Sequence, residues 1–172
     1  MQRSSTVSCL QQLQVGQGYS MKRVKIAFPC TGPGGTAETE TMWAMPVREG
    51  YVLDSIPFYA TGVSCRDVVS AVQDEYGVLR FVDVVGVGGH STVRLWLFDS
   101  DAVDPVRAAL RLLGCASEVS DIHTLIAVDI PRDVDYAVVK ALLGKKSEEE
   151  VLDYEESCLG HAWLSQPADP IR

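Results

Sequence analysis

The most regular pattern of hydrophobic and polar positions lies in residues 84–98, where a glycine-rich turn leads directly into an alternating segment. In residues 93–98, aliphatic side chains alternate with Arg94 and two aromatic side chains. A period of two is typical of a strand whose side chains point to opposite faces of a sheet. The glycines before it permit positive backbone dihedrals or a close approach of another segment. We therefore expect the polar residues 90–92 at the entrance of this strand.

Short apolar runs, separated by turns that contain glycine or proline, precede this strand. The sequence Arg48-Glu-Gly50 between two of them is typical of a hairpin with glycine in the turn. Short strands at this spacing predict a strongly curled antiparallel sheet or a small barrel. The expected strands are residues 24–28, 42–47, 51–56, 67–72 and 78–85.

Helical spacing replaces the period of two after the alternating strand. The dipeptide Asp104-Pro105 suits the N-cap and the first position of a helix, and Gly114 is expected to end it. Asp133 is expected to cap a second helix, which ends at Gly144.

The remaining segments complete a predicted fold unit. Residues 115–119 and 124–130 are predicted to form a hairpin, so the order is strand, helix, strand, strand, helix. These are five of the six elements of a ferredoxin-like βαββαβ unit. The sixth is either a strand at 151–157 or a helix at 148–159, because residues 147–150 match a helix capping box.

These patterns together predict an α+β protein with two units. An N-terminal curled antiparallel sheet or small barrel spans 21–88, and a ferredoxin-like unit spans 89–161. Residues 1–20 are rich in Ser, Gln and Gly and are predicted to be a flexible extension, and residues 162–172 a tail.

Charge and cysteine content narrow the functional classes. The 15 basic and 23 acidic residues give a net charge of −8, which repels phosphate backbones and argues against a nucleic-acid partner. The five cysteines are odd in number and far apart, so we predict reduced thiols rather than a disulfide framework. No apolar run forms a signal peptide or reaches the roughly 18 residues of a membrane span. We therefore predict a cytoplasmic protein without a membrane partner.

Several short motifs carry a resemblance to a known family. They are Asp54-Ser-Ile-Pro-Phe58, Gly62-Val63, Asp67-Val68, Gly89-His-Ser-Thr92 and Tyr154-Glu-Glu-Ser-Cys-Leu-Gly-His161. With these motifs the chain resembles, from about residue 24 to residue 161, a bacterial family known as a domain of unknown function. The family has no assigned activity, so the resemblance implies no catalytic roles.

The predicted topology brings two polar motifs together. In a ferredoxin-like sheet the first and last strands are antiparallel neighbours, which places His90 and Ser91 near Cys158 and His161, with the glutamates of residues 155–156 available to orient an imidazole. A histidine beside a hydroxyl or thiol activates a nucleophile, and two histidines with a carboxylate or thiolate hold zinc. A purely structural use of the same hydrogen bonds is equally consistent with the sequence. Structural, ligand-binding and catalytic interpretations stay open.

We predict no cofactor and no metal site. Residues 31–36 form a glycine-rich loop after a strand, but no Gly-Lys-Ser/Thr follows, so the loop is not a phosphate cradle. The histidines and cysteines lack the paired spacing of zinc ligands.

The absence of a recognisable catalytic constellation in the sequence favours a binding function. We predict a non-catalytic binding or accessory module that holds a peptide or small polar ligand, with a peptide added to a free sheet edge. The predicted ligand-binding residues are Trp43, Phe58, Tyr59, His90, Arg94 and His161.

Two other functions remain as alternatives. One is a small enzyme that uses His90 and His161 with Ser91 or Cys158, and the other is an immunity-type inhibitor of a protein partner. We also expect a homo-oligomer, because free sheet edges and a hydrophobic content of 47% leave surfaces that a monomer must protect.

Overall fold

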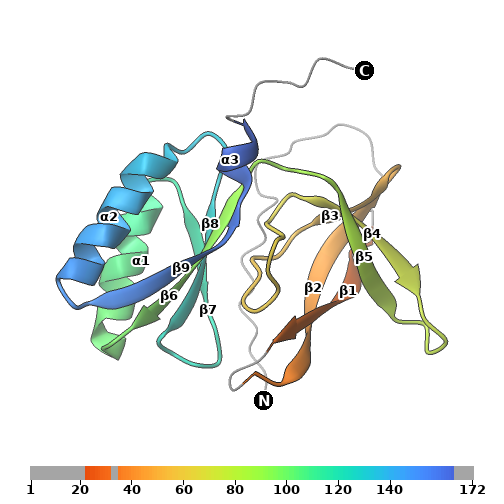
Figure 1. Ribbon diagram of the computed structural model, residues 1–172, viewed down its shortest axis with the longest axis horizontal. Coiled ribbons are helices and arrows are strands. Elements are labelled where there is room, and N and C mark those ends of the chain that lie inside the picture. Colours follow the sequence, from red (N-terminus) through yellow and green to blue (C-terminus); the bar gives the residue numbers. More distant parts are fainter. Residues whose placement is uncertain (1–21, 32–34, 165–172) are drawn as a thin grey trace.

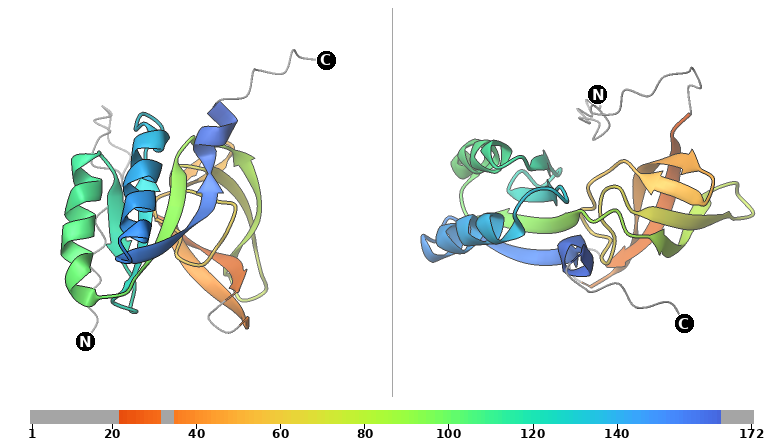
Figure 2. Two further views of the ribbon diagram at one scale, coloured as in Figure 1. Left: turned by 60° about the vertical axis from the view of Figure 1, so that its left-hand side comes forward. Right: turned by 90° about the horizontal axis from the view of Figure 1, so that it is seen from above.

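The computed structural model describes residues 22–31 and 35–164, and it shows two β-units side by side (Figure 1). The first is a closed barrel of five strands, and the second is a four-stranded sheet. Two helices cover one face of this sheet, and the barrel lies at its other face (Figure 2). The protein is therefore α+β with an N-terminal small barrel, as the sequence predicts.

The barrel closes through a parallel pair of strands. Consecutive strands are antiparallel, whereas β1 and β5 pair in parallel, with Ile26 opposite Leu79. Its core is apolar, and the ring of Phe28 stacks on that of Phe81 with centroids 4.7 Å apart. No helix occurs in the described residues before Gly50. The strands are β1 (Val24–Thr31), β2 (Ala37–Val47), β3 (Gly50–Leu53), β4 (Val68–Gln73) and β5 (Leu79–Gly86).

The second unit combines four strands with helices in the order strand, helix, strand, strand, helix, strand, followed by α3. Its sheet has the order β7-β8-β6-β9, and every neighbouring pair is antiparallel. None of the helices in the described part of the chain is long and apolar enough to cross a membrane. The elements are β6 (Ser91–Leu97), a 3-10 turn η1 (Ser100–Ala102), α1 (Val103–Leu112), β7 (Ala116–Val119), β8 (Leu125–Ile130), α2 (Tyr136–Glu148), β9 (Leu152–Leu159) and α3 (Gly160–Leu164).

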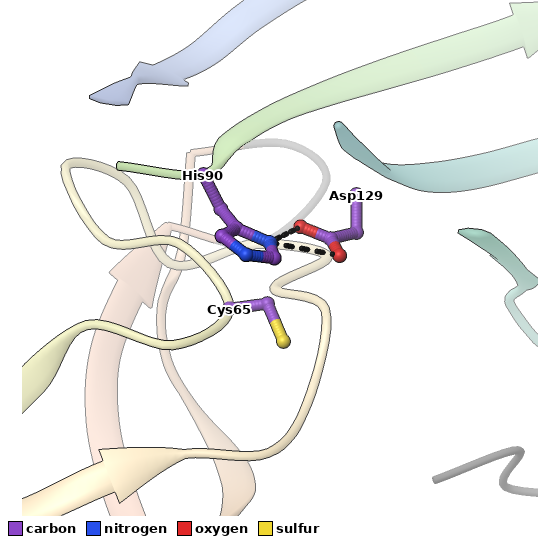
Figure 3. Close-up of side chains that lie close together, drawn as sticks. All are labelled: Cys65, His90 and Asp129. Carbon is purple, nitrogen blue, oxygen red and sulfur yellow. Dashed lines mark hydrogen bonds and ion pairs between the residues drawn. The ribbon is translucent and has the colours of Figure 1, made fainter. Parts of the chain in front are cut away.

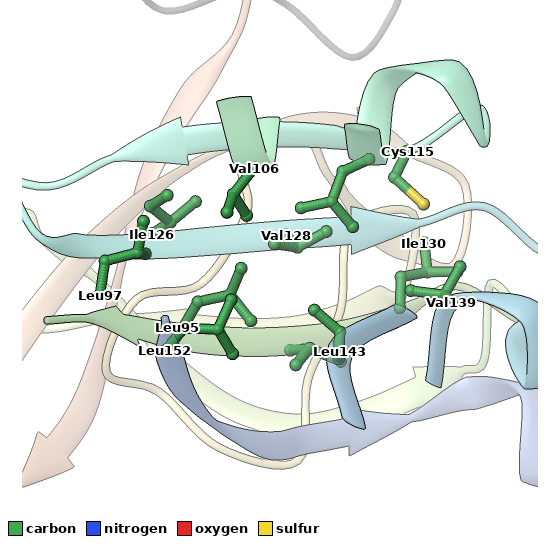
Figure 4. Packing of buried hydrophobic residues seen from close by; sticks show 12 residues of the cluster. Leu95, Leu97, Val106, Cys115, Ile126, Val128, Ile130, Val139, Leu143 and Leu152 are labelled. Carbon is green, nitrogen blue, oxygen red and sulfur yellow. The ribbon is translucent and has the colours of Figure 1, made fainter. Parts of the chain in front are cut away.

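The alternation along β6 separates two environments. Val93, Leu95 and Leu97 point to the helices and are buried with Val106 of α1 and Leu143 of α2 (Figure 4). Burial of each such side chain stabilises the fold by about 1.5–3 kcal/mol. The intervening residues of β6 face the barrel, so the period of two determines which side chains lie between the units.

The helix boundaries differ in detail from the predicted ones. Asp104 is not the N-cap of α1, because the helix begins at Val103 after Ala102, which makes no side-chain capping bond. The capping hydrogen bond lies one turn earlier, where Asp99 accepts from Asp101 N at the start of the 3-10 turn η1. Asp135 rather than Asp133 caps α2. Gly144 does not end α2, since a glycine inside a helix costs only about 1 kcal/mol and the buried Leu143 holds that turn against the sheet. The helix ends instead before Glu150, whose φ is 54°.

The sixth element is a strand, not a helix. β9 pairs with the free edge of β6, from Ser91 opposite Leu159 to Leu97 opposite Leu152. The capping box at 147–150 is wrong because Ser147 lies inside α2. Residues 162–164 of the predicted tail belong to α3, while the extension at 1–20 and residues 165–172 lie outside the described residues.

The segment between the barrel strands β3 and β4, residues 54–67, makes contacts with the sheet of the second unit. We call it the β3–β4 loop, and it lies between the barrel and the sheet in Figure 1. Gly62 N donates to Ser157 O of β9 at 3.3 Å, and Arg94 of β6 donates to the carbonyl of Phe58. The loop therefore covers the face of the sheet that the helices leave free.

Candidate functional site

Buried polar side chains gather where the β3–β4 loop meets the sheet. Such groups are costly in an apolar interior unless each is hydrogen-bonded, so a concentration of them marks a region with a specific role. The buried polar residues of the described chain, most of which lie at this contact, are Asp54, Ser64, Asp67, Ser91, Thr92, Arg94 and Asp129.

His90, Asp129 and Cys65 form one cluster at this contact (Figure 3). His90 Nδ1 lies 2.9 Å and 3.1 Å from the two carboxylate oxygens of Asp129. Since an ionised carboxylate only accepts hydrogen bonds, Nδ1 carries the proton. One nitrogen, sulfur or oxygen atom of each residue lies within 4.8 Å of the others. Cys65 comes from the β3–β4 loop, His90 immediately precedes β6, and Asp129 lies near the end of β8.

Asp67 organises the glycine-rich turn beside this cluster. Its carboxylate accepts hydrogen bonds from Gly88 N at 2.7 Å and from Ser64 N at 2.8 Å. Burial raises the pKa of the Asp67 carboxyl above its ordinary value, and these two hydrogen bonds offset part of that rise. A Cβ atom on Gly88 would lie 2.6 Å from the carbonyl carbon of Arg66. The glycine-rich turn is therefore needed for a close approach of two backbones, one of the two roles predicted for it.

Ser91 and His161 form a second cluster. Ser91 Oγ and His161 Nδ1 are 2.7 Å apart, and His161 Nε2 lies 3.1 Å from the carbonyl oxygens of Pro131 and Val134. Because carbonyls only accept, Nε2 carries the proton and Nδ1 accepts from the hydroxyl. Ser91 is fully buried, so its hydroxyl has no access to a substrate.

His90 and His161 do not share one site in the structure. Ser91 lies opposite Ile130, which packs against the helices, whereas Asp129 is the next residue along β8 and points to the barrel. His90 and His161 are therefore bound to groups on opposite faces of the sheet. Sequence reasoning placed both at one edge correctly but did not resolve on which face each side chain would lie.

The other residues expected at the joint site have different partners. Cys158 pairs with Thr92 at an irregularity of the β6–β9 ladder, and burial raises the pKa of its thiol, which disfavours the nucleophilic thiolate. Glu155 forms an ion pair with Arg94, and Glu156 accepts from Tyr136.

A pocket lies beside Arg94, on the barrel side of the sheet. It has a volume of about 340 Å³. The guanidinium donates from Nη1 to the carbonyls of Phe58 and Tyr59 at 2.8 Å and 3.2 Å. Its Nε is buried and has no hydrogen-bond partner among the described residues. The lining residues are Pro29, Cys30, Thr31, Tyr59, Thr61 and Arg94.

Glu40 of β2 shapes the loop that borders this pocket. Its carboxylate accepts hydrogen bonds from three successive backbone N–H groups, those of Phe58, Tyr59 and Ala60, at 2.7, 3.0 and 2.7 Å. The predicted binding residue Trp43 lies elsewhere, under the cationic groups of Arg23 and Lys25 at 5.2 Å and 4.8 Å from its ring centroid. Of the predicted ligand-binding residues, Tyr59 and Arg94 line the pocket.

Three central residues were missing from the sequence candidates. Asp129 offered a signal, because it is a charged residue inside the apolar run 125–130, where a buried partner is required. Cys65 and Glu40 offered none, since each acts through segments that are distant along the chain. Their roles follow from the path of the β3–β4 loop.

Comparison with known proteins supports the fold and the family. A solved structure described as a novel crystal structure of a hypothetical protein from Neisseria gonorrhoeae is similar, with a TM-score of 0.71 and 18% identity. The match covers 83% of this chain and 99% of that chain, and at this identity it shows likeness of fold alone. No curated protein matches the sequence. The profile of a domain of unknown function, DUF4265, matches residues 40–154, which is more than half of the chain, and the protein therefore belongs to this family.

Proposed function

We propose that the protein is a non-catalytic binding module that holds a peptide end or a small polar ligand in the pocket beside Arg94. The observation that carries this proposal is the buried Nε of Arg94, which has no hydrogen-bond partner in the described chain although its residue lines the pocket. A buried donor without an acceptor costs about 1–3 kcal/mol. A ligand oxygen that reached this guanidinium after a small shift of the side chain would recover that cost.

The charges around the pocket favour a ligand that carries both an acceptor and a donor. Burial raises the pKa of the Cys30 thiol, and the nearby carboxylates of Glu40 and Glu38 raise it further. Burial raises the pKa of Tyr59, and the carboxylate of Asp121, in the turn between β7 and β8, raises it further. The guanidinium of Arg94 already forms an ion pair with Glu155, so its remaining donor suits a carbonyl or carboxylate oxygen of the ligand, and the nearby acids suit an amine. A volume of about 340 Å³ is at the small end of the range for ligand pockets.

The positions of the candidate nucleophiles support binding rather than catalysis. Ser91 and Cys65 are fully buried, and burial raises the pKa of the Cys158 thiol. A nucleophile has to reach its substrate and carry a neighbouring base. Ser91 has His161 as a neighbouring base, but its buried hydroxyl cannot reach a substrate.

A panel of free amino acids and dipeptides, with N-acetylated dipeptides as analogues that lack the amine, tests the proposal. Binding is followed by amide chemical shifts in NMR and by the melting temperature. We expect binding of the free forms to shift the amides of residues 58–61 and to weaken at least tenfold in Arg94→Lys.

Arg107→Lys is the matched control, because this arginine also donates to a backbone carbonyl, that of Ser117, but lies at α1. Melting temperatures of the ligand-free variants show whether each is folded. Failure of every compound to bind, or equal binding by Arg94→Lys, would contradict the proposal.

We also propose that residues 91–159 form a ferredoxin-like unit. The connectivity strand, helix, strand, strand, helix, strand supports this assignment. The position of β6 between β8 and β9 supports it as well, because the first strand of such a unit is central and pairs with the last.

Self-association remains part of the proposal. The outer surface of β4 and β5 exposes Val72, Val82 and Val85, with exposed fractions of 63%, 57% and 52%. Exposed apolar side chains are a feature of surfaces that contact other proteins. A cytoplasmic location is likewise proposed, supported by the free thiols of Cys30, Cys115 and Cys158.

A further inference from the structure

We propose that Cys65, His90 and Asp129 form a binding site for one divalent transition-metal ion of the zinc type. The site is distinct from the pocket beside Arg94, and it does not depend on the ligand proposed there. It would link the barrel to the sheet, because Cys65 belongs to the β3–β4 loop whereas the other two residues belong to the sheet unit.

The three side chains are already close enough for a shared ion. Their ligand atoms lie within 4.8 Å of one another, so some point lies no more than 2.8 Å from all three (4.8 Å divided by √3). Zinc bonds to sulfur, nitrogen and oxygen are about 2.0–2.3 Å long. Shifts of less than about 1 Å per side chain would therefore complete the coordination.

The kind of ligand atom selects the class of ion. A thiolate, an imidazole and a carboxylate together suit Zn²⁺ or Co²⁺, whereas Mg²⁺ and Ca²⁺ take oxygen ligands. Three protein ligands leave a fourth position of a tetrahedral ion open for water. The side chain of His90 keeps an exposed fraction of 12%, while that of Asp129 is fully buried, so His90 lies on the solvent side of the site.

The charges around the cluster favour a cation. Asp67 and Asp129 are two buried carboxylates that both influence each other and His90 electrostatically. A divalent ion between the three ligand atoms would be attracted by both carboxylates, because buried charges are stabilised when they are paired or bind metal.

Binding of the ion would replace protons that the cluster holds now. The thiol of Cys65 makes a weak contact of 3.9 Å with Leu53 O, and His90 Nδ1–H donates to Asp129. The ion would take the place of the thiol proton and of the proton between imidazole and carboxylate. Both protons would leave to solvent, as is general for thiolate and imidazole ligands.

Cobalt titration of the full chain tests the proposal. The protein is first treated with a chelator and then titrated with Co²⁺ alone, while the thiolate-to-cobalt absorption in the near ultraviolet is recorded. We expect saturation at about one equivalent and a rise in melting temperature, since an ion that binds only the folded state stabilises it. Cys65→Ser should abolish the band, and His90→Gln should weaken binding at least tenfold.

Three control variants separate this site from other thiols and imidazoles and from the pocket beside Arg94. Cys30→Ser and His123→Ala change residues outside the cluster and should keep the full band, as should Arg94→Lys. If Cys65→Ser does not fold, Asp129→Asn keeps the size of the side chain and an acceptor for His90, and it should still weaken Co²⁺ binding at least tenfold. Absence of the band in the wild type, or a band that persists in Cys65→Ser and Asp129→Asn, would overturn the proposal.

Discussion

Ser91 and His161 lie 70 positions apart and are joined by two hydrogen bonds. Ser91 Oγ donates to His161 Nδ1 at 2.7 Å and accepts from the backbone N–H of His161 at 3.2 Å. On the other side of the imidazole, His161 Nε2–H donates to the carbonyls of Pro131 and Val134, which follow β8. These hydrogen bonds attach His161 of α3 to the first residue of β6 and to the segment before α2.

Removal of either partner should destabilise the fold. Ser91→Ala leaves the Nδ1 acceptor and the His161 N–H without their partner, which costs about 1–3 kcal/mol of unfolding free energy. The double variant with His161→Ala should be less destabilised than the sum of the two single variants, because the shared bond is lost only once. Urea denaturation measures all three, with His123→Ala, an exposed histidine, as the control. Additive effects would show that the two side chains are not coupled.

Two glycines should respond to alanine in opposite directions. A Cβ on Gly160 would lie 2.0 Å from His90 O, so Gly160→Ala forces backbone apart and should cost about 1–3 kcal/mol. Gly144 lies inside α2 with nothing within 4 Å of its Cβ position, so Gly144→Ala should stabilise by about 0.5–1 kcal/mol. Thermal unfolding of the pair compares the two sites directly. Equal effects would contradict the close contact between Gly160 and His90.

The bond between Tyr136 and Glu156 should give a pH-dependent contribution to stability. The hydroxyl of Tyr136 donates to Glu156 at 2.5 Å, and Lys140 lies 2.9 Å from the same carboxylate. These two hydrogen bonds hold the pKa of Glu156 below its ordinary 4.5, that of Tyr136 having the larger effect. A carboxyl with a lowered pKa stabilises the fold above its unfolded pKa and loses that contribution as the pH falls through its folded pKa.

Tyr136→Phe should therefore cost about 1 kcal/mol at pH 7, and less at acidic pH. Urea denaturation from pH 7 down to pH 3 measures the difference between this variant and the wild type. We expect the difference to shrink as the pH falls below 4.5, the ordinary pKa. A difference that stayed constant across this range would show that Glu156 is not the acceptor that matters.

Self-association should depend on the valines of β4 and β5. Val82→Lys places a charge in the exposed apolar surface and should lower the association constant at least tenfold. Val138→Lys is the matched control, since Val138 lies on α2 with an exposed fraction of 48%. Sedimentation velocity over a range of concentrations measures both. A wild type that stays monomeric at every concentration would refute the prediction.

The order of elements was predictable because local signals determine it. Alternation in 93–98 indicated β6, and Gly50, the first residue of β3, indicated the hairpin that β3 forms with β2. The end of α2 was not predictable from Gly144, because burial of Leu143 outweighs the cost of one glycine. The strand β9 also required the free edge of β6, which is a tertiary feature.

The candidate site was predictable in part for the same reason. The proximity of Ser91 and His161 followed from pairing of the first and last strands. The partners of His90 did not, since Cys65 reaches the site only through the path of the β3–β4 loop. A sequence pattern predicts which face a strand residue takes, but it does not predict which loop covers that face.

The carboxylate of Glu40 occupies a backbone site of the kind that binds a free anion in other proteins. Three successive N–H groups around one anionic group form the kind of nest that binds phosphate or sulfate in other proteins. In Glu40→Ala this nest would be empty, and added acetate, which has the same carboxylate group, should refill it and restore part of the lost melting temperature. In Glu40→Ala the shape of the pocket beside Arg94 would then depend on the acetate concentration. The reason is that an anion in the nest holds the backbone of residues 58–60, which borders the pocket.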